Sequence, residues 1–207
     1  MFLFHHILDS VLYPWEVITV LKQAIENIIR EGIDGYHLIS EGVLAGNNVR
    51  IADTARIEGP TIISDGCELR HGAYIRGSVI LGKGCVVGNS TEIKNSILMD
   101  GAQAPHFNYV GDSILGKGAH LGAGAICSNL RSDKETVAIK GADFSLDTGL
   151  RKLGAILGDG VEVGCGAVLC PGTVIGKNAS VYPLTMTRGV YPANCIIKQN
   201  DVVKKYT

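Results

Sequence analysis

The sequence predicts an all-β fold, a left-handed parallel β-helix built from hexapeptide repeats. The first observation behind this prediction is that large aliphatic residues recur at every sixth position from Ile51 to Ile93, and again from Leu157 to Val181. The second is that the residue four places after these anchors is mostly small or β-branched, as at Ala73. A period of six fits neither an amphipathic helix nor an alternating strand. It is typical of a β-helix, in which each hexad forms one short strand and turn and three hexads close one coil.

Between the two runs the rhythm continues, with two steps of five residues that end at Leu98 and Leu115. A sandwich of short strands with glycine turns is the alternative, but such a fold has no reason to keep a six-residue register over so many steps. The anchors are Ile51, Ile57, Ile63, Leu69, Ile75, Leu81, Val87, Ile93, Leu98, Ala104, Val110, Leu115, Leu121, Leu157, Val163, Leu169, Ile175 and Val181.

The composition is that of a globular protein without a strongly charged surface. The chain has 207 residues, 46% hydrophobic and 19% charged, with a formal net charge of -1, which argues against nucleic acid as a partner. No apolar run approaches the roughly 18 residues of a membrane span, and the N-terminal stretch lacks the cationic start and cleavage site of an export signal. We therefore expect no membrane association and a cytoplasmic location. The six cysteines have no zinc-finger spacing, so we expect buried reduced thiols and no metal.

Two segments depart from the hexad rhythm. Residues 13–32 carry Pro14 near a helix start, an apolar stripe at helical spacing, and Gly32 as a stop, which predicts an amphipathic helix packed near the first coil. Residues 127–151 carry charges and no anchor, which predicts a long inserted loop of the kind that is functional or disordered. We expect a helical extension over 1–48 and a β-helix over 49–207. Its identical stacked faces favour association into a homotrimer.

Residues about 18 apart lie directly above one another in this fold, separated by roughly 4.8 Å. Arg76 and Lys94 each follow an anchor, lie one coil apart, and are continued in the same column by Gly111. Two cations at that spacing repel each other unless an anion lies between them or solvent screens them. The pair therefore predicts an anion site with open space at Gly111. A solvated column of charges, partly neutralised by Glu58, is the alternative.

The neighbouring corner gathers groups suited to acid–base chemistry. Glu92 and Tyr109 share one column, and His71 and His106 share another. We expect the Glu92 carboxylate to orient the imidazole of His106, so that His106 acts as a general base beside the anion site. Zinc bound to His71 and His106 is the alternative, but the position five residues after His106 that could supply a third imidazole is Gly111.

These residues occur in stretches that resemble a known family. The stretches IRGSVILGKGCVVGNSTEIKNS, PHFNYVGDSILG and LGAGAICSNL resemble the left-handed β-helix acetyltransferase domain of the bifunctional UDP-N-acetylglucosamine pyrophosphorylase/glucosamine-1-phosphate N-acetyltransferases, particularly the archaeal-type sugar-phosphate enzymes. The resemblance covers about residues 50–195. It does not extend to the nucleotidyltransferase domain of those enzymes. We therefore expect no uridylyl transfer from this chain and consider a separate nucleotidyltransferase as a partner.

The resemblance implies a role for each matching residue. Arg76 and Lys94 correspond to sugar-phosphate ligands, His106 to the catalytic base, Tyr109 to a substrate contact, and Asn129 to the residue that places substrate and acetyl group. In the implied reaction, His106 takes a proton from the sugar amine, the amine attacks the thioester of acetyl-CoA, and backbone donors stabilise the oxyanion.

The resemblance also implies two coenzyme contacts and an acceptor sugar. Ala123 falls where the family uses a backbone amide near the acetyl-CoA carbonyl, and Cys165 falls where relatives often carry a serine that contacts the coenzyme. Glucosamine 1-phosphate is the acceptor that the resemblance favours. However, His120 and Leu130 stand where bacterial relatives carry Asn and Tyr, which leaves the sugar open. The alternatives are acyl transfer to another sugar or nucleotide-sugar, and a non-catalytic trimeric subunit that partners a nucleotidyltransferase.

Overall fold

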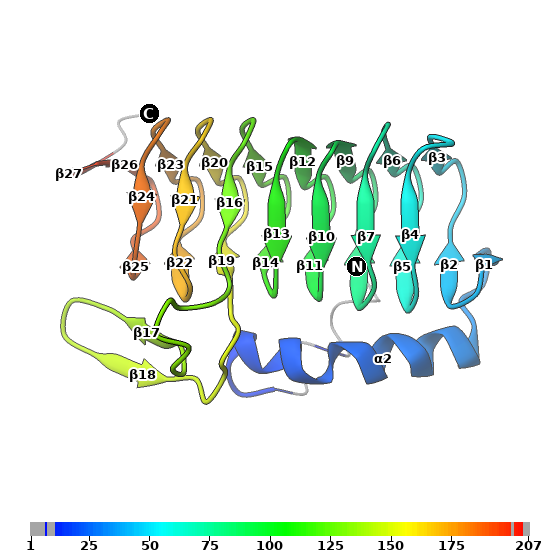
Figure 1. Cartoon of the computed structure of the whole chain (residues 1–207), viewed down its shortest axis with the longest axis horizontal. Helices are drawn as coiled ribbons and strands as arrows, with labels where there is room; N and C mark the ends of the chain where they lie inside the picture. The colour runs from blue at the N-terminus through cyan, green and yellow to red at the C-terminus, as the bar shows by residue number, and fades with distance from the viewer. Residues whose placement is uncertain (1–6, 8–10, 200, 205–207) are drawn as a thin grey trace.

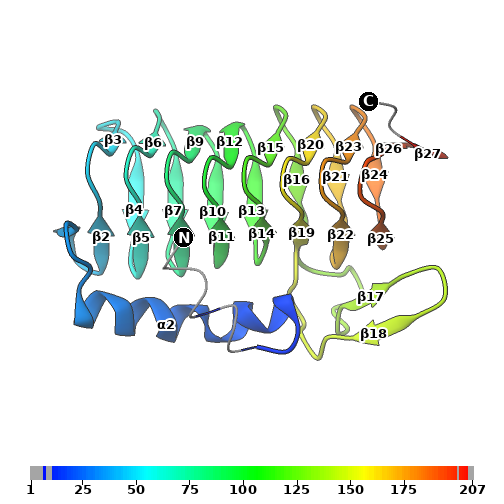
Figure 2. The same ribbon diagram turned by 180° about the vertical axis from the view of Figure 1, so that it is seen from behind.

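Stacked coils of three short strands form a parallel β-solenoid, which Figures 1 and 2 show from opposite sides. The structure is a computed structural model that describes residues 7, 11–199 and 201–204. Successive strands of a coil join three different sheets, and each pairs in parallel with its counterpart one coil on, as Ile62 does with Ile80. The predicted β-helix architecture is therefore confirmed.

The three sheets are named A, B and C in the order in which the chain first visits them. Sheet A runs in the order β1 (His37–Ser40), β2 (Val43–Ala45), β5 (Thr61–Ile63), β8 (Val79–Leu81), β11 (Ser96–Leu98), β14 (Ile114–Leu115), β19 (Ala155–Leu157), β22 (Thr173–Ile175) and β25 (Val190–Tyr191). Sheet B runs in the order β3 (Arg50–Ile51), β6 (Glu68–Leu69), β9 (Val86–Asn89), β12 (Gln103–His106), β15 (His120–Leu121), β20 (Glu162–Val163), β23 (Ser180–Val181), β26 (Cys195–Lys198) and β27 (Asp201–Lys204). Sheet C runs in the order β4 (Arg56–Glu58), β7 (Tyr74–Arg76), β10 (Glu92–Lys94), β13 (Tyr109–Gly111), β16 (Ile126–Cys127), β21 (Val168–Leu169) and β24 (Met186–Thr187).

The hexad anchors point inward and stack into one continuous core. Every anchor from Ile63 to Val181 is buried, together with small residues four places on, such as Ala73. Ile51 stays 37% exposed because its strand β3 is at the edge of sheet B. The cysteines are all free, and four of them are buried, whereas Cys165 is exposed and Cys170 is partly exposed.

The helix α2 (Val17–Glu31) confirms the amphipathic helix predicted over 13–32. It follows a short 3-10 turn, η1 (Pro14–Glu16), and ends at Gly32, whose φ of 79° suits a residue without a side chain. Its buried residues Leu21 and Ile25 pack against an apolar row on the outer face of sheet A. This row is Leu44, Ile62, Ile80, Ile97 and Ile114.

The length of the apolar row explains why α2 covers more than the first coil. Four coil steps from Leu44 to Ile114 span roughly 19 Å, and the 15 residues of α2 span roughly 22 Å. In Figures 1 and 2 the helix runs along the stack from the side of β14, where it begins, to β2, where it ends.

The segment between β16 and β19 leaves the coils, as predicted, but it is not a structureless loop. It folds into an antiparallel hairpin of β17 (Ala138–Lys140) and β18 (Ser145–Asp147). Val137 and Ile139 are 1% and 2% exposed and belong to the apolar cluster that also contains α2. The alternation of apolar and less buried residues over 137–140 is a strand signal that the surrounding charges conceal.

Parallel stacking begins before the predicted boundary between residues 48 and 49. Strand β2 already pairs in parallel with β5, Val43 opposite Thr61, so the segment assigned to the helical extension supplies a strand of the first coil. The division into two domains otherwise stays a prediction. Within the described part of the chain, no helix combines the length and the apolar character needed to cross a bilayer.

We predict that Leu21→Ala lowers the free energy of unfolding by about 2–5 kcal/mol, because it leaves a cavity between α2 and sheet A. Leu21 is fully buried, whereas the adjacent Val20 is 41% exposed. The control Val20→Ala should therefore change the unfolding free energy by no more than about 0.5 kcal/mol. Chemical denaturation followed by circular dichroism measures both variants, and equal effects would contradict the packing of α2.

Candidate active site

Sheet C carries two columns of outward side chains on either side of the inward anchors. The coil register sets both columns, since Ile75, Ile93 and Val110 lie opposite one another in β7, β10 and β13. The predicted stacking of Arg76 on Lys94 and of Glu92 on Tyr109 is confirmed. We number the columns by position in the three-residue strands, so that the inward anchors form the second column. The first column is Tyr74, Glu92 and Tyr109, and the third column is Glu58, Arg76, Lys94 and Gly111.

Each of the two stacked cations has a carboxylate partner. Arg76 Nη1 donates to Glu92 Oε1 at 2.6 Å, with the two side chains 40% and 34% exposed, and this contact raises the pKa of Arg76. Lys94 Nζ lies 3.8 Å from Asp112 Oδ2. We expected Glu92 to orient the imidazole of His106. Among the described residues its carboxylate instead binds Arg76, and no hydrogen bond joins it to the imidazole.

Asp112 is the buried centre of this site, with only 4% of its side chain exposed. Asn95 Nδ2 donates to Asp112 Oδ1 at 2.7 Å, and Asn129 Nδ2 donates to Oδ2. These donors and the nearby ammonium of Lys94 compensate the cost of burying the carboxylate. Asn95 Nδ2 also lies 3.3 Å from the carbonyl oxygen of Ile18, so hydrogen bonds connect α2 to the site.

The sequence prediction missed Asp112, although the sequence holds a signal for it. The two five-residue steps of the hexad rhythm span the corners that contain Asn95 and Asp112. Both residues adopt a left-handed backbone, with φ of 46° and 48°, a conformation that Asn and Asp tolerate better than most residues. Two consecutive shortened corners with Asn or Asp therefore mark a stacked polar pair.

Gly111 leaves the room in which Tyr109 and Asn129 meet. Asn129 Nδ2 donates to Tyr109 Oη at 3.2 Å. A Cβ atom at position 111 would lie 2.5 Å from Tyr109 Oη and 2.7 Å from Asn129 Nδ2, which is too close for either contact. The space predicted at Gly111 is thus occupied by two polar groups. Burial and the negative charge of Asp112 raise the pKa of Tyr109, so its hydroxyl stays neutral.

His106, Ala123 and Cys165 lie stacked along the corner between sheets B and C. Gly124 N donates to His106 O at 2.9 Å, and Gly166 N donates to Ala123 O at 2.8 Å, so each of these residues lies one coil beyond the last. The side chains of His106 and Cys165 are both exposed. The structure thus brings the predicted base and the two predicted coenzyme positions into one column.

The His106 column and the column of Arg76 and Lys94 flank sheet C on opposite sides. The first and third residues of a strand are about 7 Å apart, and Tyr109 starts the strand that follows His106.

Another imidazole in the described chain does have a carboxylate partner. On the outer face of sheet B, His120 Nδ1 lies 3.0 Å from Glu162 Oε2, one coil away. No cluster of three or more His, Cys, Asp or Glu side chains suited to a metal ion occurs in the described ranges.

We predict that Asp112→Asn lowers the pKa of Tyr109, because it removes the negative charge that disfavours tyrosinate and keeps the side-chain shape. Since the folded-state pKa is raised, the stability contributed by the neutral phenol is present below the ordinary tyrosine pKa of about 10. This stability is lost as the pH rises through the pKa that Tyr109 has in the folded state. An NMR titration with isotope-labelled tyrosine, assigned through Tyr109→Phe, measures this pKa.

The matched control is Asp100→Asn, which removes a carboxylate bound to the backbone N–H of Lys83 at another corner. It should leave the pKa of Tyr109 unchanged. A Tyr109 pKa that is the same in the wild type and in Asp112→Asn would show that the two groups do not interact as described.

Comparisons with known proteins identify relatives of this chain. Residues 57–164 match the family model described as the GMPPB C-terminal domain. The bifunctional sugar-1-phosphate nucleotidylyltransferase/acetyltransferase of Sulfurisphaera tokodaii is 32% identical over 188 residues, which are 82% of this chain and 43% of that protein. The bifunctional protein GlmU of Methanococcus vannielii is 36% identical over 116 residues, which are 53% of this chain and 25% of that protein. The chain thus matches less than half the length of these relatives.

Solved structures with a similar fold include two acyltransferases. A mutant of AntD, an N-acyltransferase from Bacillus cereus in complex with dTDP-4-amino-4,6-dideoxyglucose and coenzyme A, aligns with a TM-score of 0.47 and 15% identity, covering 84% of this chain and 93% of that chain. The acetyltransferase domain of PglB from Neisseria gonorrhoeae, in complex with acetyl coenzyme A, aligns with a TM-score of 0.39 and 16% identity, covering 78% of this chain and 64% of that chain.

The matched family model covers more than half of the sequence and includes every site residue from Arg76 to Asn129. The chain therefore belongs to the family of GMPPB C-terminal domains.

Proposed function

We propose that this chain transfers the acetyl group of acetyl-CoA to the amine of an amino-sugar 1-phosphate, with glucosamine 1-phosphate as the first acceptor to test. The observation that carries the proposal is the arrangement around sheet C. Arg76 and Lys94 are stacked at one side and His106 is exposed at the other. Tyr109 lies on the coil after Lys94, and Asn129 lies one coil further, in contact with Tyr109. The relative from Sulfurisphaera, named as a sugar-1-phosphate nucleotidylyltransferase/acetyltransferase, supports the same class of reaction.

In this proposal the sugar phosphate binds to Arg76 and Lys94. The guanidinium of Arg76 is held by Glu92 through Nη1, and its other N–H groups stay available for phosphate oxygens. The Lys94 side chain is 28% exposed and its ammonium is only loosely paired with Asp112. Because Glu92 already positions Arg76, little side-chain entropy of Arg76 remains to be lost when the phosphate binds.

His106 is proposed to take the proton that the sugar amine loses during acyl transfer. Its imidazole is exposed, and within the described chain no side chain occupies its ring nitrogens, so one nitrogen can accept that proton. Glu92 is bound to Arg76 and so acts as a positioning residue for the phosphate. Its predicted action on the imidazole stays a prediction.

The corner that continues from His106 suits an elongated acyl donor. The N–H of Ala123 has no acceptor among the described residues, and the adjacent Gly124 carries no side chain. Acetyl-CoA supplies the acyl group as a thioester. The free N–H of Ala123, one coil from His106, fits a donor to the acyl oxygen.

We also propose that the chain acts as a homotrimer. Large apolar side chains are exposed along and beside the same corner, with Phe107 61%, Leu184 79% and Met186 64% exposed. Such residues beside a polar site favour burial against a second copy of the chain.

The proposal predicts that the purified chain releases free thiol from acetyl-CoA when glucosamine 1-phosphate or galactosamine 1-phosphate is present. His106→Ala should lower kcat by about 10²-fold or more, which is the range of general-base catalysis. His37→Ala, an exposed imidazole on the edge strand β1, is the matched control and should retain full activity. If no thiol is released with either sugar phosphate, the proposal is rejected. Release that occurs only with nucleotide-sugars would favour the alternative acceptor class.

A second prediction concerns the phosphate ligands. Arg76→Gln and Lys94→Gln should each raise KM for glucosamine 1-phosphate by about 10-fold or more, since each removes a charge-assisted hydrogen bond to phosphate. Their KM for unphosphorylated glucosamine should stay near that of the wild type. Arg70→Gln, which removes a cation paired with Glu68 on sheet B, serves as the control. Equal KM changes for both acceptors would contradict the assignment.

A further inference from the structure

A second pair of cations lies near the end of the column that holds Arg76 and Lys94, with Arg188 in the column itself and Lys140 on the adjacent hairpin strand β17. The register pairs Leu169 with Thr187, which puts Cys170 and then Arg188 in the third column of sheet C. Lys94 and Arg188 are four coil steps apart, or roughly 19 Å. One sugar phosphate cannot bridge that distance.

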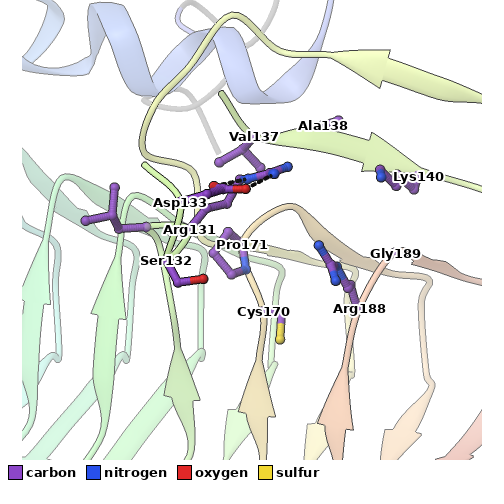
Figure 3. A pocket seen from close by; sticks show the side chains of 11 residues that line it. Arg131, Ser132, Asp133, Val137, Ala138, Lys140, Cys170, Pro171, Arg188 and Gly189 are labelled. Carbon is purple, nitrogen blue, oxygen red and sulfur yellow. Dashed lines mark hydrogen bonds and ion pairs between the residues drawn. The ribbon is translucent and has the colours of Figure 1, made fainter. Parts of the chain in front are cut away.

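A cavity of about 310 Å³ lies between these last coils and the hairpin of β17 and β18 (Figure 3). Its lining includes Cys170 and Arg188 from the coils, and Arg131, Asp133 and Lys140 from the insertion. This volume is at the lower end of the range for small-molecule pockets.

The lining of this cavity carries positive charge without a partner. Arg131 and Asp133 form a two-point ion pair, and this contact lowers the pKa of Asp133 to about 2, so these charges cancel. Burial raises the pKa of Cys170, which keeps its thiol neutral. Lys140 and Arg188 face the cavity from the hairpin and from the coils (Figure 3). Neither has a carboxylate within ion-pair distance in residues 7, 11–199 and 201–204.

The hairpin that forms one wall of the cavity is fixed against the coils. A Cβ atom at Gly189 would lie 2.7 Å from Lys140 O, and one at Gly172 would lie 2.8 Å from Val137 Cγ1. Val137 and Ile139 are buried in the cluster that contains α2. The cavity is therefore formed before any ligand arrives, which lowers the ordering cost of binding.

We propose that this cavity binds a phosphoryl group through Lys140 and Arg188, at a site separate from the acetyl-transfer site. Two unpaired cations match the charge of a phosphate dianion, and the planar guanidinium of Arg188 can donate to two of its oxygens. The phosphoryl group can come from a free phosphate ester or from the nucleotide end of coenzyme A. The proposal does not depend on the acetyltransferase activity.

Isothermal titration calorimetry on the full chain tests this site with two probes, glucosamine 1-phosphate and adenosine 3′,5′-bisphosphate. The wild type should bind at least one probe at this site. The double variant Lys140→Gln/Arg188→Gln should weaken that binding by about 10-fold or more for each charge removed. Lys117→Gln, an exposed lysine outside the cavity, should bind as the wild type does. The double variant Arg76→Gln/Lys94→Gln should also keep this binding.

Three results would overturn the proposal. They are no binding of either probe to the wild type, unchanged binding in the Lys140→Gln/Arg188→Gln variant, and loss of all binding in the Arg76→Gln/Lys94→Gln variant. The two probes are compared in the Arg76→Gln/Lys94→Gln variant, which lacks the proposed acceptor site. Tighter binding of adenosine 3′,5′-bisphosphate to this variant assigns the cavity to the coenzyme end, and tighter binding of glucosamine 1-phosphate assigns it to a free ester. Arg188→Lys keeps the charge and should bind better than Arg188→Gln, which separates loss of charge from loss of fold.

Discussion

The register between stacked coils is the constraint on which the candidate site depends. Ile75, Ile93 and Val110 must lie above one another, because a slip of one residue would turn every side chain to the opposite face. Burying such a side chain contributes about 1.5–3 kcal/mol, whereas an exposed ion pair contributes about 0–1 kcal/mol. The core therefore imposes on Arg76 and Lys94 a spacing that their mutual repulsion opposes, and the carboxylates of Glu92 and Asp112 make that spacing tolerable.

The departures from the repeat gather at the corner where the chain passes from sheet C to sheet A. Both five-residue steps, with Asn95 and Asp112, fall there, and the insertion leaves the coils directly after Asn129. At a corner the backbone is not part of a strand ladder, so a deleted residue or an inserted hairpin disturbs no strand pairing. The same corner faces α2, which is why the carbonyl of Ile18 can accept a hydrogen bond from Asn95.

The sequence was sufficient to predict whatever follows from backbone register, and insufficient for what depends on side-chain conformation. The anchors, α2 and the stacking of Arg76 on Lys94 follow from a spacing of six and a stripe at helical spacing. The partner of Glu92 does not follow from the spacing. A carboxylate between a guanidinium and an imidazole can reach either one by rotating about its side-chain bonds. Asp112 was missed because its importance lies in being buried between Asn95 and Asn129. The hairpin was missed because charged neighbours conceal a strand of only three residues.

The two pairs of cations proposed to bind anions differ in how they would hold them. Arg76 and Lys94 are balanced by Glu92 and Asp112, so little net charge would attract a phosphate from a distance. In the proposed function, binding there would depend on hydrogen-bond geometry, which Glu92 fixes in advance for Arg76. Lys140 and Arg188 have no such balance in the described chain, so their attraction for an anion acts over about a Debye length and weakens as salt is added. The first arrangement favours selection of a ligand by shape, and the second favours its capture by charge.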